Sequence, residues 1–265
     1  TDYREVFTGK YLAANLFTFR PWRKLDVSFG NSIIYDYDQP HIAYFIPVMF
    51  YKAVDHHLSS GQDNMNSHLF FDISSRLIPK THLYATLFLD EVAVDRIWDS
   101  DESNFWSFKG GLRLTNILPN LYAGYEHTRS NALVFEHYVT TLTFESNRFN
   151  LGHYLRDNAI EHHAVIGYRP LRNLDVSLSW THAEKGPDHT TLGTPRLGIE
   201  PFTPVEWESN VVRLSAQWQV INDVYVRLSY TSSNISGDEE AVERYTAGFW
   251  RGERNVVGIG VNVGW

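Results

Sequence analysis

The sequence lacks cysteine entirely, has no long hydrophobic run and carries fewer basic than acidic residues. Without cysteine, disulfide bonds, thiolate catalysis and cysteine-based metal sites are excluded. No run of about 18 apolar residues occurs, so a membrane-spanning helix is excluded as well. The 23 Lys and Arg against 31 Asp and Glu give a net charge of -8, which argues against nucleic acid as a partner.

Aromatic residues, by contrast, make up 15% of the 265 residues. Such a content suits the aromatic girdles of a membrane protein or a carbohydrate-binding surface, and it also suits an aromatic β-sheet core. A chain of this size is able to bury a substantial core or to close a mid-sized barrel. The residues from Thr1 onward do not resemble a signal peptide, so we expect a mature protein or a fragment.

The C-terminal stretch 256–265 shows the clearest pattern in the chain. Its side chains alternate between an apolar face and a face of Gly and Asn, as expected for a strand with period two. In a transmembrane barrel the apolar face contacts lipid and the small, polar face lines the interior. A strand that ends the chain on Trp also resembles the terminal signature of bacterial outer-membrane proteins, which the barrel-assembly machinery recognises. The residues of the apolar face are Val257, Ile259, Val261, Val263 and Trp265.

Turn-forming residues recur along the chain between stretches of alternating hydrophobicity. Pro and Asn preset turn dihedrals in most of the segments 20–24, 78–81, 117–120, 169–173, 221–223 and 251–254. The apolar faces of the flanking stretches contain no charged residue, which fits a wall facing lipid, where a midplane Arg or Lys would cost roughly 2–4 kcal/mol. A half-buried sheet of a soluble protein would exclude charges in the same way.

Long polar connections at 36–65, 92–103, 184–207 and 233–254 separate the predicted hairpins. Short turns on one side and long loops on the other are typical of outer-membrane barrels. If the C-terminus is periplasmic, the final strand has to run toward the periplasm. The segment 251–254 then belongs to a long external loop and is not a short turn.

These patterns predict an all-β fold, an antiparallel transmembrane β-barrel in the bacterial outer membrane. We expect a single domain over 1–265, with extracellular long loops and about 13 strands, including strands around Phe144 and Leu151. Because bacterial barrels have even strand numbers, we expect these strands to be the C-terminal part of a larger barrel of about eighteen strands. Completion of the barrel by a partner chain is the alternative.

Several longer segments resemble a known family. The most distinctive is Leu151–Ala159, and others are Phe29–Tyr35, Tyr44–His56 and Gly167–Leu174. Together they resemble the Wzi-type capsule-assembly outer-membrane proteins, in the form found in Bacteroidota, from about Leu25 to Trp265. The resemblance implies a monomeric β-barrel that helps to hold or organise surface polysaccharide. The N-terminal part of that family, with its early strands and helical plug, has no counterpart here.

The predicted long loop 36–65 is too apolar for an ordinary exposed loop. Tyr44, Phe50 and Tyr51 would be costly in water, so we expect the loop either to fill the barrel lumen or to offer a platform for glycan or for a partner. Further candidates for glycan or partner binding are the loop residues His56, His57, Arg156, Asp157 and Asn158. Asp157 and Asn158 have a structural alternative, because Asp and Asn favour tight turns.

Metal binding and catalysis have weaker sequence support. The histidine pairs His56-His57 and His162-His163 would point to opposite faces if they lie on strands, so they are poor chelates. His153 lies near Asp157 in the sequence, and His163 and Ser177 would be the only suggestion of a hydrolase pair. We therefore expect no metal site, no cofactor and no enzymatic activity.

The sequence favours a non-enzymatic protein of capsule or surface polysaccharide assembly. Its expected partners are outer-membrane lipid and lipopolysaccharide, surface polysaccharide and other outer-membrane proteins. Two alternatives remain open: a structural subunit of a larger outer-membrane complex, and a diffusion pore. The pore is disfavoured if the apolar loop 36–65 occupies the lumen.

Overall fold

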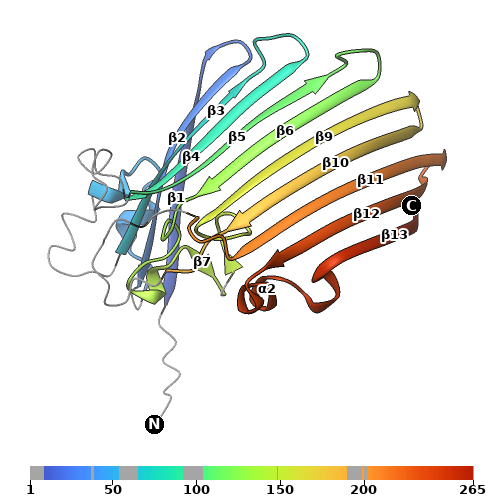
Figure 1. Cartoon of the computed structure of the whole chain (residues 1–265). Coiled ribbons are helices and arrows are strands. Elements are labelled where there is room, and N and C mark those ends of the chain that lie inside the picture. The colour runs from blue at the N-terminus through green and yellow to red at the C-terminus, as the bar shows by residue number, and fades with distance from the viewer. Residues whose placement is uncertain are drawn as a thin grey trace.

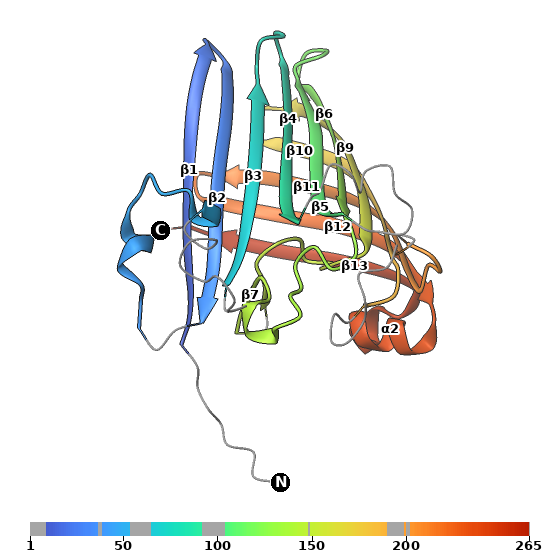
Figure 2. The same cartoon turned by 90° about the vertical axis from the view of Figure 1, so that its left-hand side faces the viewer.

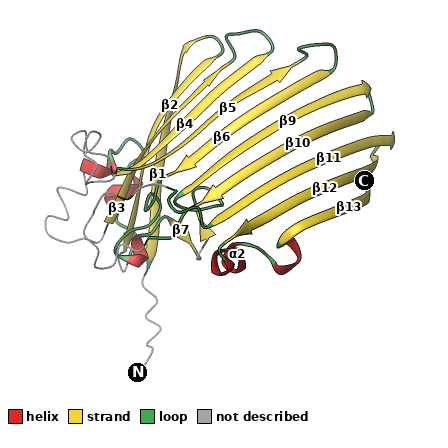
Figure 3. Ribbon diagram, in the orientation of Figure 1, coloured by secondary structure: helices red, strands yellow, loops and turns green. Residues whose placement is uncertain are grey.

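The computed structural model describes residues 9–36, 39–53, 65–91, 104–147, 149–189, 199 and 202–264. Eleven of its strands form one antiparallel sheet (Figures 1 and 3). Each strand pairs with the next sheet strand along the chain, so the sheet is a meander. Its strands are β1 (Lys10–Trp22), β2 (Leu25–Asp36), β3 (Met65–Ser75), β4 (Thr81–Glu91), β5 (Phe105–Thr115), β6 (Leu121–Ser130), β9 (Ala159–Leu171), β10 (Leu174–Lys185), β11 (Trp207–Ile221), β12 (Val224–Gly237) and β13 (Gly252–Val263).

The two ends of the sheet differ as the sequence predicts. Tight turns at 23–24, 76–80, 116–120, 172–173 and 222–223 join strands at one end, called here the turn end. Residues such as Asn120 and Asp223 occupy left-handed backbone conformations in these turns, with φ of 65° and 62°. Long connections join the strands at the opposite loop end. The segment 251–254 lies at the loop end, as predicted, and β13 begins within it.

The sheet is strongly curved and has one apolar and one polar face. Figure 2 shows β1 to β6 on the near side and β10 to β13 behind them. The convex face carries exposed apolar side chains, among them Leu214 (49% exposed) and Ile259 (76% exposed). Arg113, Glu126 and His163 lie on the opposite, concave face, because they alternate with the apolar residues along their strands.

The sheet is not closed in the described part of the chain. Its edge strands, β1 and β13, each pair with one neighbour only. The strands expected around Phe144 and Leu151 are not part of the wall. They correspond to β7 (Glu145–Ser146) and β8 (Phe149–Asn150), which form a separate two-stranded hairpin. The count of about 13 strands is therefore reached only with this hairpin, and the wall itself has eleven.

The described part of the predicted loop 36–65, residues 39–53, does not fill the concave side. It includes the 3-10 helix η1 (Ile42–Phe45). Tyr44 and Tyr51 pack in one cluster with Ile33, Tyr35 and Met65. The strand residues of this cluster share the convex face with the apolar residues Val27 and Phe29 further along β2, so the lumen-filling expectation is wrong for these residues.

Residues 131–147 and 149–158, called here the inward segment, occupy the concave side at the loop end. Leu133, Val134 and Phe135 are buried there in a cluster that includes Phe105 of β5. The Asn66 side-chain amide of β3 donates a hydrogen bond to the Leu142 carbonyl (3.2 Å). The long connection that fills the concave side thus lies between β6 and β9.

The helix α2 (Glu239–Tyr245) closes the same end from the C-terminal strands. Its N-terminus is capped by Asp238, whose side chain accepts a hydrogen bond from the Glu240 amide. Ala241 packs against Leu155 of the inward segment and against Trp207 of β11 in a third buried cluster. The inward segment and α2 together cover the loop end of the concave face.

Candidate functional site

The concave face holds two side-chain arrangements of the same design, each built on a tyrosine that lies over a glycine of the adjacent strand. A Cβ atom at Gly111 would come within 2.2 Å of the Tyr84 ring, and one at Gly167 within 2.1 Å of the Tyr122 ring. Both glycines pair directly with their tyrosine across the strands. The missing side chains allow the rings to lie flat on the wall.

The first arrangement brings a carboxylate between a phenol and an ammonium group. The Tyr84 hydroxyl donates to Glu126 Oε2 (2.6 Å), and Lys109 Nζ lies 3.1 Å from Oε1. The Arg113 guanidinium lies over the Tyr84 ring, with its Cζ 5.3 Å from the ring centroid. These side chains hold three neighbouring strands, β4, β5 and β6, together on one face.

The second arrangement repeats the design on β6, β9 and β10. The Tyr122 hydroxyl donates to Asp175 Oδ1 (2.8 Å), and Arg169 Nε donates to Oδ2 of the same carboxylate (2.8 Å). The Arg169 guanidinium also lies over the Tyr122 ring, 5.4 Å from its centroid. Arg169 therefore has a carboxylate of its own, which Arg113 lacks among the described residues.

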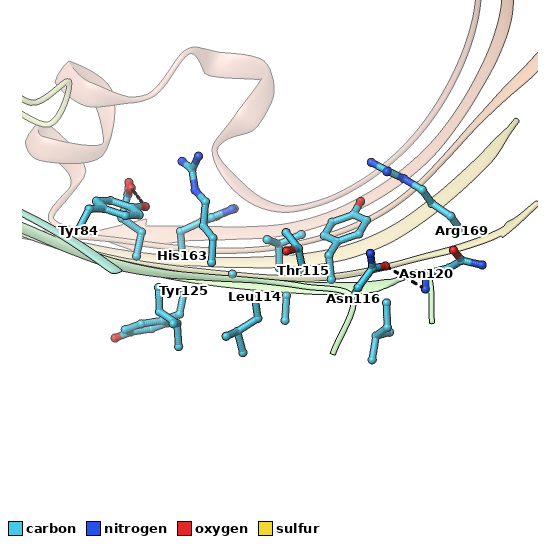
Figure 4. A pocket seen from close by; sticks show the side chains of 16 residues that line it. Tyr84, Leu114, Thr115, Asn116, Asn120, Tyr125, His163 and Arg169 are labelled. Carbon is cyan, nitrogen blue, oxygen red and sulfur yellow. Dashed lines mark hydrogen bonds between the residues drawn. The ribbon is translucent and has the colours of Figure 1, made fainter. Parts of the chain in front are cut away.

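A recess of about 620 Å³ lies between the two arrangements and extends to the turn between β5 and β6 (Figure 4). Figure 4 shows Tyr84, His163, Thr115 and Arg169 pointing to the concave side, whereas Tyr125 and Leu114 point to the convex side. The concave lining includes Tyr84, Arg113, Asn116, Tyr122, His163 and Arg169.

The ring-over-glycine packing predicts a clear effect of adding one methyl group. Gly111→Ala should push the Tyr84 ring from its place, break its bond to Glu126 and destabilise the protein by about 1–3 kcal/mol. Gly260→Ala is the matched control, since a Cβ there meets no atom within 4 Å. We expect the control to stay within about 0.5 kcal/mol of the parent in urea unfolding from lipid vesicles. Equal effects of both substitutions would contradict the packing described.

The predicted binding residues of the loop 36–65 have different fates. Tyr44 and Tyr51 are 5% and 2% exposed, so they hold the segment to the sheet and do not offer a platform. Phe50 is 41% exposed and stacks on Phe29 at 6.5 Å. His56 and His57 lie outside the described residues.

The predicted residues Asp157 and Asn158 are buried and structural. Asp157 Oδ1 accepts a hydrogen bond from the Phe135 amide (3.0 Å). The Asn158 side chain donates to the Pro187 carbonyl (3.0 Å) and accepts from the Phe202 amide (2.9 Å). Burial raises the pKa of the Asp157 carboxyl to about 8, and the nearby Glu136 carboxyl adds to the shift. Both side chains are buried, 5% and 1% exposed, and bond residues distant in the sequence, so they hold the fold of the loop end and are not open to a glycan.

Arg156 lies beside them with a left-handed φ of 63°. Its guanidinium lies 3.4 Å from the Glu145 carboxylate, within the inward segment. The residue is therefore engaged in the fold of the segment, and its role in ligand binding stays a prediction.

Sequence analysis missed Lys185, the most important cation at the loop end. Its side chain is 1% exposed and donates to the Asp157 carbonyl (2.6 Å). It also lies 2.9 Å from the Asp188 carboxylate and 5.0 Å from the Tyr245 ring centroid. This lysine joins the inward segment, β10 and α2, and the sequence placed it in the predicted connection 184–207, where nothing marked it.

His163 and His153 have other partners than the sequence suggests in the part of the chain that the structure describes. No three His, Asp or Glu side chains there gather in a way that would hold a metal ion. His163 Nδ1 lies 2.8 Å from the Thr181 hydroxyl, and His163 pairs with Thr181, not with Ser177. His153 lies 3.7 Å from Glu161, so the suggested pairs with Ser177 and Asp157 are not formed.

The predicted C-terminal strand is present as β13. The alternation is confirmed, since Val257, Ile259, Val261 and Val263 are 58–76% exposed on the convex face. Trp265 lies outside the described residues, and recognition of the strand by assembly machinery stays a prediction.

Comparison with known proteins adds no family assignment. No family model and no curated protein matches the sequence. The structure of the porin NanC in a rhombohedral crystal form matches 97% of this chain and 99% of its own length, at 8% identity and a TM-score of 0.37. The crystal structure of Pseudomonas aeruginosa OccD3 (OpdP) matches 95% of this chain and 59% of its own, at 10% identity and a TM-score of 0.40. TM-scores below 0.5 do not establish a common fold, and the resemblance to capsule-assembly proteins stays a prediction.

Proposed function

We propose that this sheet is the wall of an outer-membrane β-barrel, and that its concave face lines a lumen for small polar solutes. The observation that carries the proposal is the separation of the two faces. In the sheet strands from β3 to β13 the convex face is apolar over the central part of each strand, whereas Asn15 and Asn31 interrupt it on β1 and β2. Ionised side chains such as Lys109, Arg113 and Glu126 lie on the concave face. Lipid on one side and water on the other account for this arrangement.

The height of the apolar band supports a membrane. On the convex side of β11, the residues from Val220 to Val212 are apolar, a length of roughly 26 Å along the strand and a height of about 20 Å at a tilt of about 40°. At its loop-end border the strands carry a continuous polar row, in which each residue pairs with the next across the sheet. The row consists of His127, His162, His182, Asn210 and Asn234. A soluble sheet has no need of such a border, whereas a lipid headgroup layer provides a reason for it.

A pore fits the interior better than a glycan platform does. The expected platform residues Tyr44 and Tyr51 are buried on the convex side. The described residues 39–53 of the apolar loop therefore do not occupy the lumen. The inward segment narrows the loop end, and the polar recess near the turn end is left open. Narrowing of a barrel by a loop is compatible with selective passage.

The free edges of β1 and β13 bear on a second candidate, a subunit of a larger outer-membrane assembly. In hydrocarbon each unsatisfied backbone group costs several kcal/mol, so both edges have to be paired in the membrane. Strands of another protein would satisfy them and make this sheet one part of a composite wall. Fixed protein partners after mild detergent extraction would favour this candidate.

The pore is tested by single-channel conductance of the protein purified from its outer membrane and placed in planar bilayers. We expect stepwise currents that rise severalfold when Glu136–His153 of the inward segment is replaced by a short Gly-Ser linker. Shortening the convex-face segment at Ile42–Val48 is the control and should leave the conductance unchanged. The absence of steps from both the parent and the linker variant would overturn the pore.

A further inference from the structure

We infer that the concave recess binds a small solute that carries one carboxylate and several hydroxyl groups, with Arg113 as the anchor for the carboxylate. The inference rests on the proposed pore and names its substrate class. The recess has the volume of a small-ligand site, about 620 Å³ against a usual range of roughly 300–1,000 Å³.

Arg113 has no counter-ion within salt-bridge distance among the described residues. The carboxylate nearest in the arrangement, Glu126, already accepts from the Tyr84 hydroxyl and pairs with Lys109. Two other arginines of the same face, Arg20 and Arg169, have carboxylates at 2.6 and 2.8 Å. Among the described residues Arg113 thus contacts the ring and the hydroxyl of Tyr84 and has no carboxylate within salt-bridge distance, so the rest of its guanidinium is available to a ligand.

The Arg113 guanidinium is also held in place before a ligand arrives. Its stacking on Tyr84 fixes one side of the planar group, and Tyr84 is fixed by Gly111 and Glu126. A guanidinium positioned in this way offers its remaining N–H groups as a fork that matches a carboxylate. Little side-chain entropy is then lost on binding.

Polar groups surround Arg113 in the recess. Gly124 contributes no side chain to the floor of the recess, and Asn116 and Asn120 form its turn-end wall with Thr115. His163 uses Nδ1 for Thr181, which leaves Nε2 for other partners. Amide, hydroxyl and imidazole groups are suited to the hydroxyls of a sugar, whereas a hydrophobic anion would leave them unpaired.

The balance of charge selects an anion over a cation. Three cations, Lys109, Arg113 and Arg169, face two carboxylates, Glu126 and Asp175, so the two arrangements carry an excess positive charge. Both carboxylates have their oxygens occupied by tyrosine and by a cation. A cationic solute would find no free carboxylate in the arrangements that flank the recess.

The test is the block of single-channel current by sugars, with glucuronate, glucose and acetate as probes. We expect glucuronate to block the parent at concentrations at which glucose and acetate have little effect. Arg113→Gln should raise the half-blocking concentration of glucuronate roughly ten- to a hundredfold. Arg213→Gln is the matched control, because Arg213 lies on the concave face and forms no ion pair among the described residues, yet does not line the recess.

Each outcome has a defined meaning. Equal block by glucose would overturn the role of the carboxylate, and equal block by acetate would overturn the role of the hydroxyls. An equal rise of the half-blocking concentration of glucuronate in Arg113→Gln and Arg213→Gln would overturn the site, because the positive charge of the whole lumen would then account for the block. Calorimetric titration of the detergent-solubilised protein with glucuronate separates the inference from the pore. Binding that depends on Arg113 without any conductance would support the site and overturn the pore, and conductance without such binding would do the reverse.

Discussion

An arginine in place of Leu214 is expected to lower the free energy of unfolding from a bilayer by about 2–4 kcal/mol. Leu214 lies at the centre of β11 on the convex face, with 49% of its surface exposed, and Leu178 and Tyr230 flank it across the sheet. In the proposed membrane its side chain lies inside the hydrocarbon, one convex-face position from Ala216 at the middle of the apolar band. A guanidinium there has no counter-ion and loses its hydration.

Depth is the variable that this experiment isolates. Ile221→Arg is the control, because Ile221 is 65% exposed at the turn end of the same strand, where the cost falls to about 0–1 kcal/mol. Both variants would be unfolded in urea from vesicles, with tryptophan fluorescence as the signal. Similar, small effects of the two substitutions would mean that the convex face meets water or protein, and would refute the membrane wall.

Raising the pH from about 5 to 8.5 is expected to loosen the inward segment by more than about tenfold in its opening equilibrium. The folded pKa of Asp157 is raised from 3.8 to about 8. The folded protein therefore keeps this carboxyl protonated while an opened segment ionises it. The stability that the group contributes is fully present below about 3.8 and is lost as the pH rises through about 8. Burial also raises the pKa of Glu136, which acts in the same direction.

Hydrogen exchange of the Phe135 and Asn158 amides, corrected for its intrinsic pH dependence, measures this opening. Asp157→Asn keeps an acceptor for the Phe135 amide and cannot ionise. We expect the variant to show a much flatter profile than the parent, with Glu136 responsible for what remains. A parent profile as flat as that of the variant would show that Asp157 is ionised in the folded protein.

The wall of the fold was predictable because strand periodicity is a local property. Val257 to Val263 alternate in the sequence, and the strand has the faces that the alternation requires. The turn segments at 221–223 and 169–173 were equally readable, because Asn and Pro restrict the backbone within a few residues. The end at which each connection lies then followed from the order of turns and loops.

The inward segment was not predictable by the same means. Glu145–Ser146 and Phe149–Asn150 are extended, so their local pattern is that of strands, but their partners are each other and not the wall. Only tertiary contacts, such as the bond between Asn66 and Leu142, decide that this connection turns inward. For the apolar loop with Tyr44 the sequence left burial and an exposed platform open, because the side of the sheet on which the loop packs depends on which strand face it meets.

The recess was missed for a related reason. Tyr84 and Gly111 lie far apart in the sequence and meet only through the register of β4 and β5. A glycine in a strand signals close approach of another group. Gly111 and Gly167 were therefore the available signals, but the identity of the approaching tyrosine required the strand pairing.

The direction of the two free edge strands restricts which further strands are able to close the barrel. Eleven strands of alternating direction place β1 and β13 parallel to each other, both running from the loop end to the turn end. Antiparallel closure thus requires an odd number of further strands, the first and last of which run the opposite way. A second copy inserted with the same orientation also has edge strands that run from the loop end to the turn end. Rotation of that copy about the membrane normal does not change this direction. Pairing between the β1 edge of one copy and the β13 edge of another would therefore be parallel. An antiparallel barrel has to be closed by strands whose edges run from the turn end to the loop end.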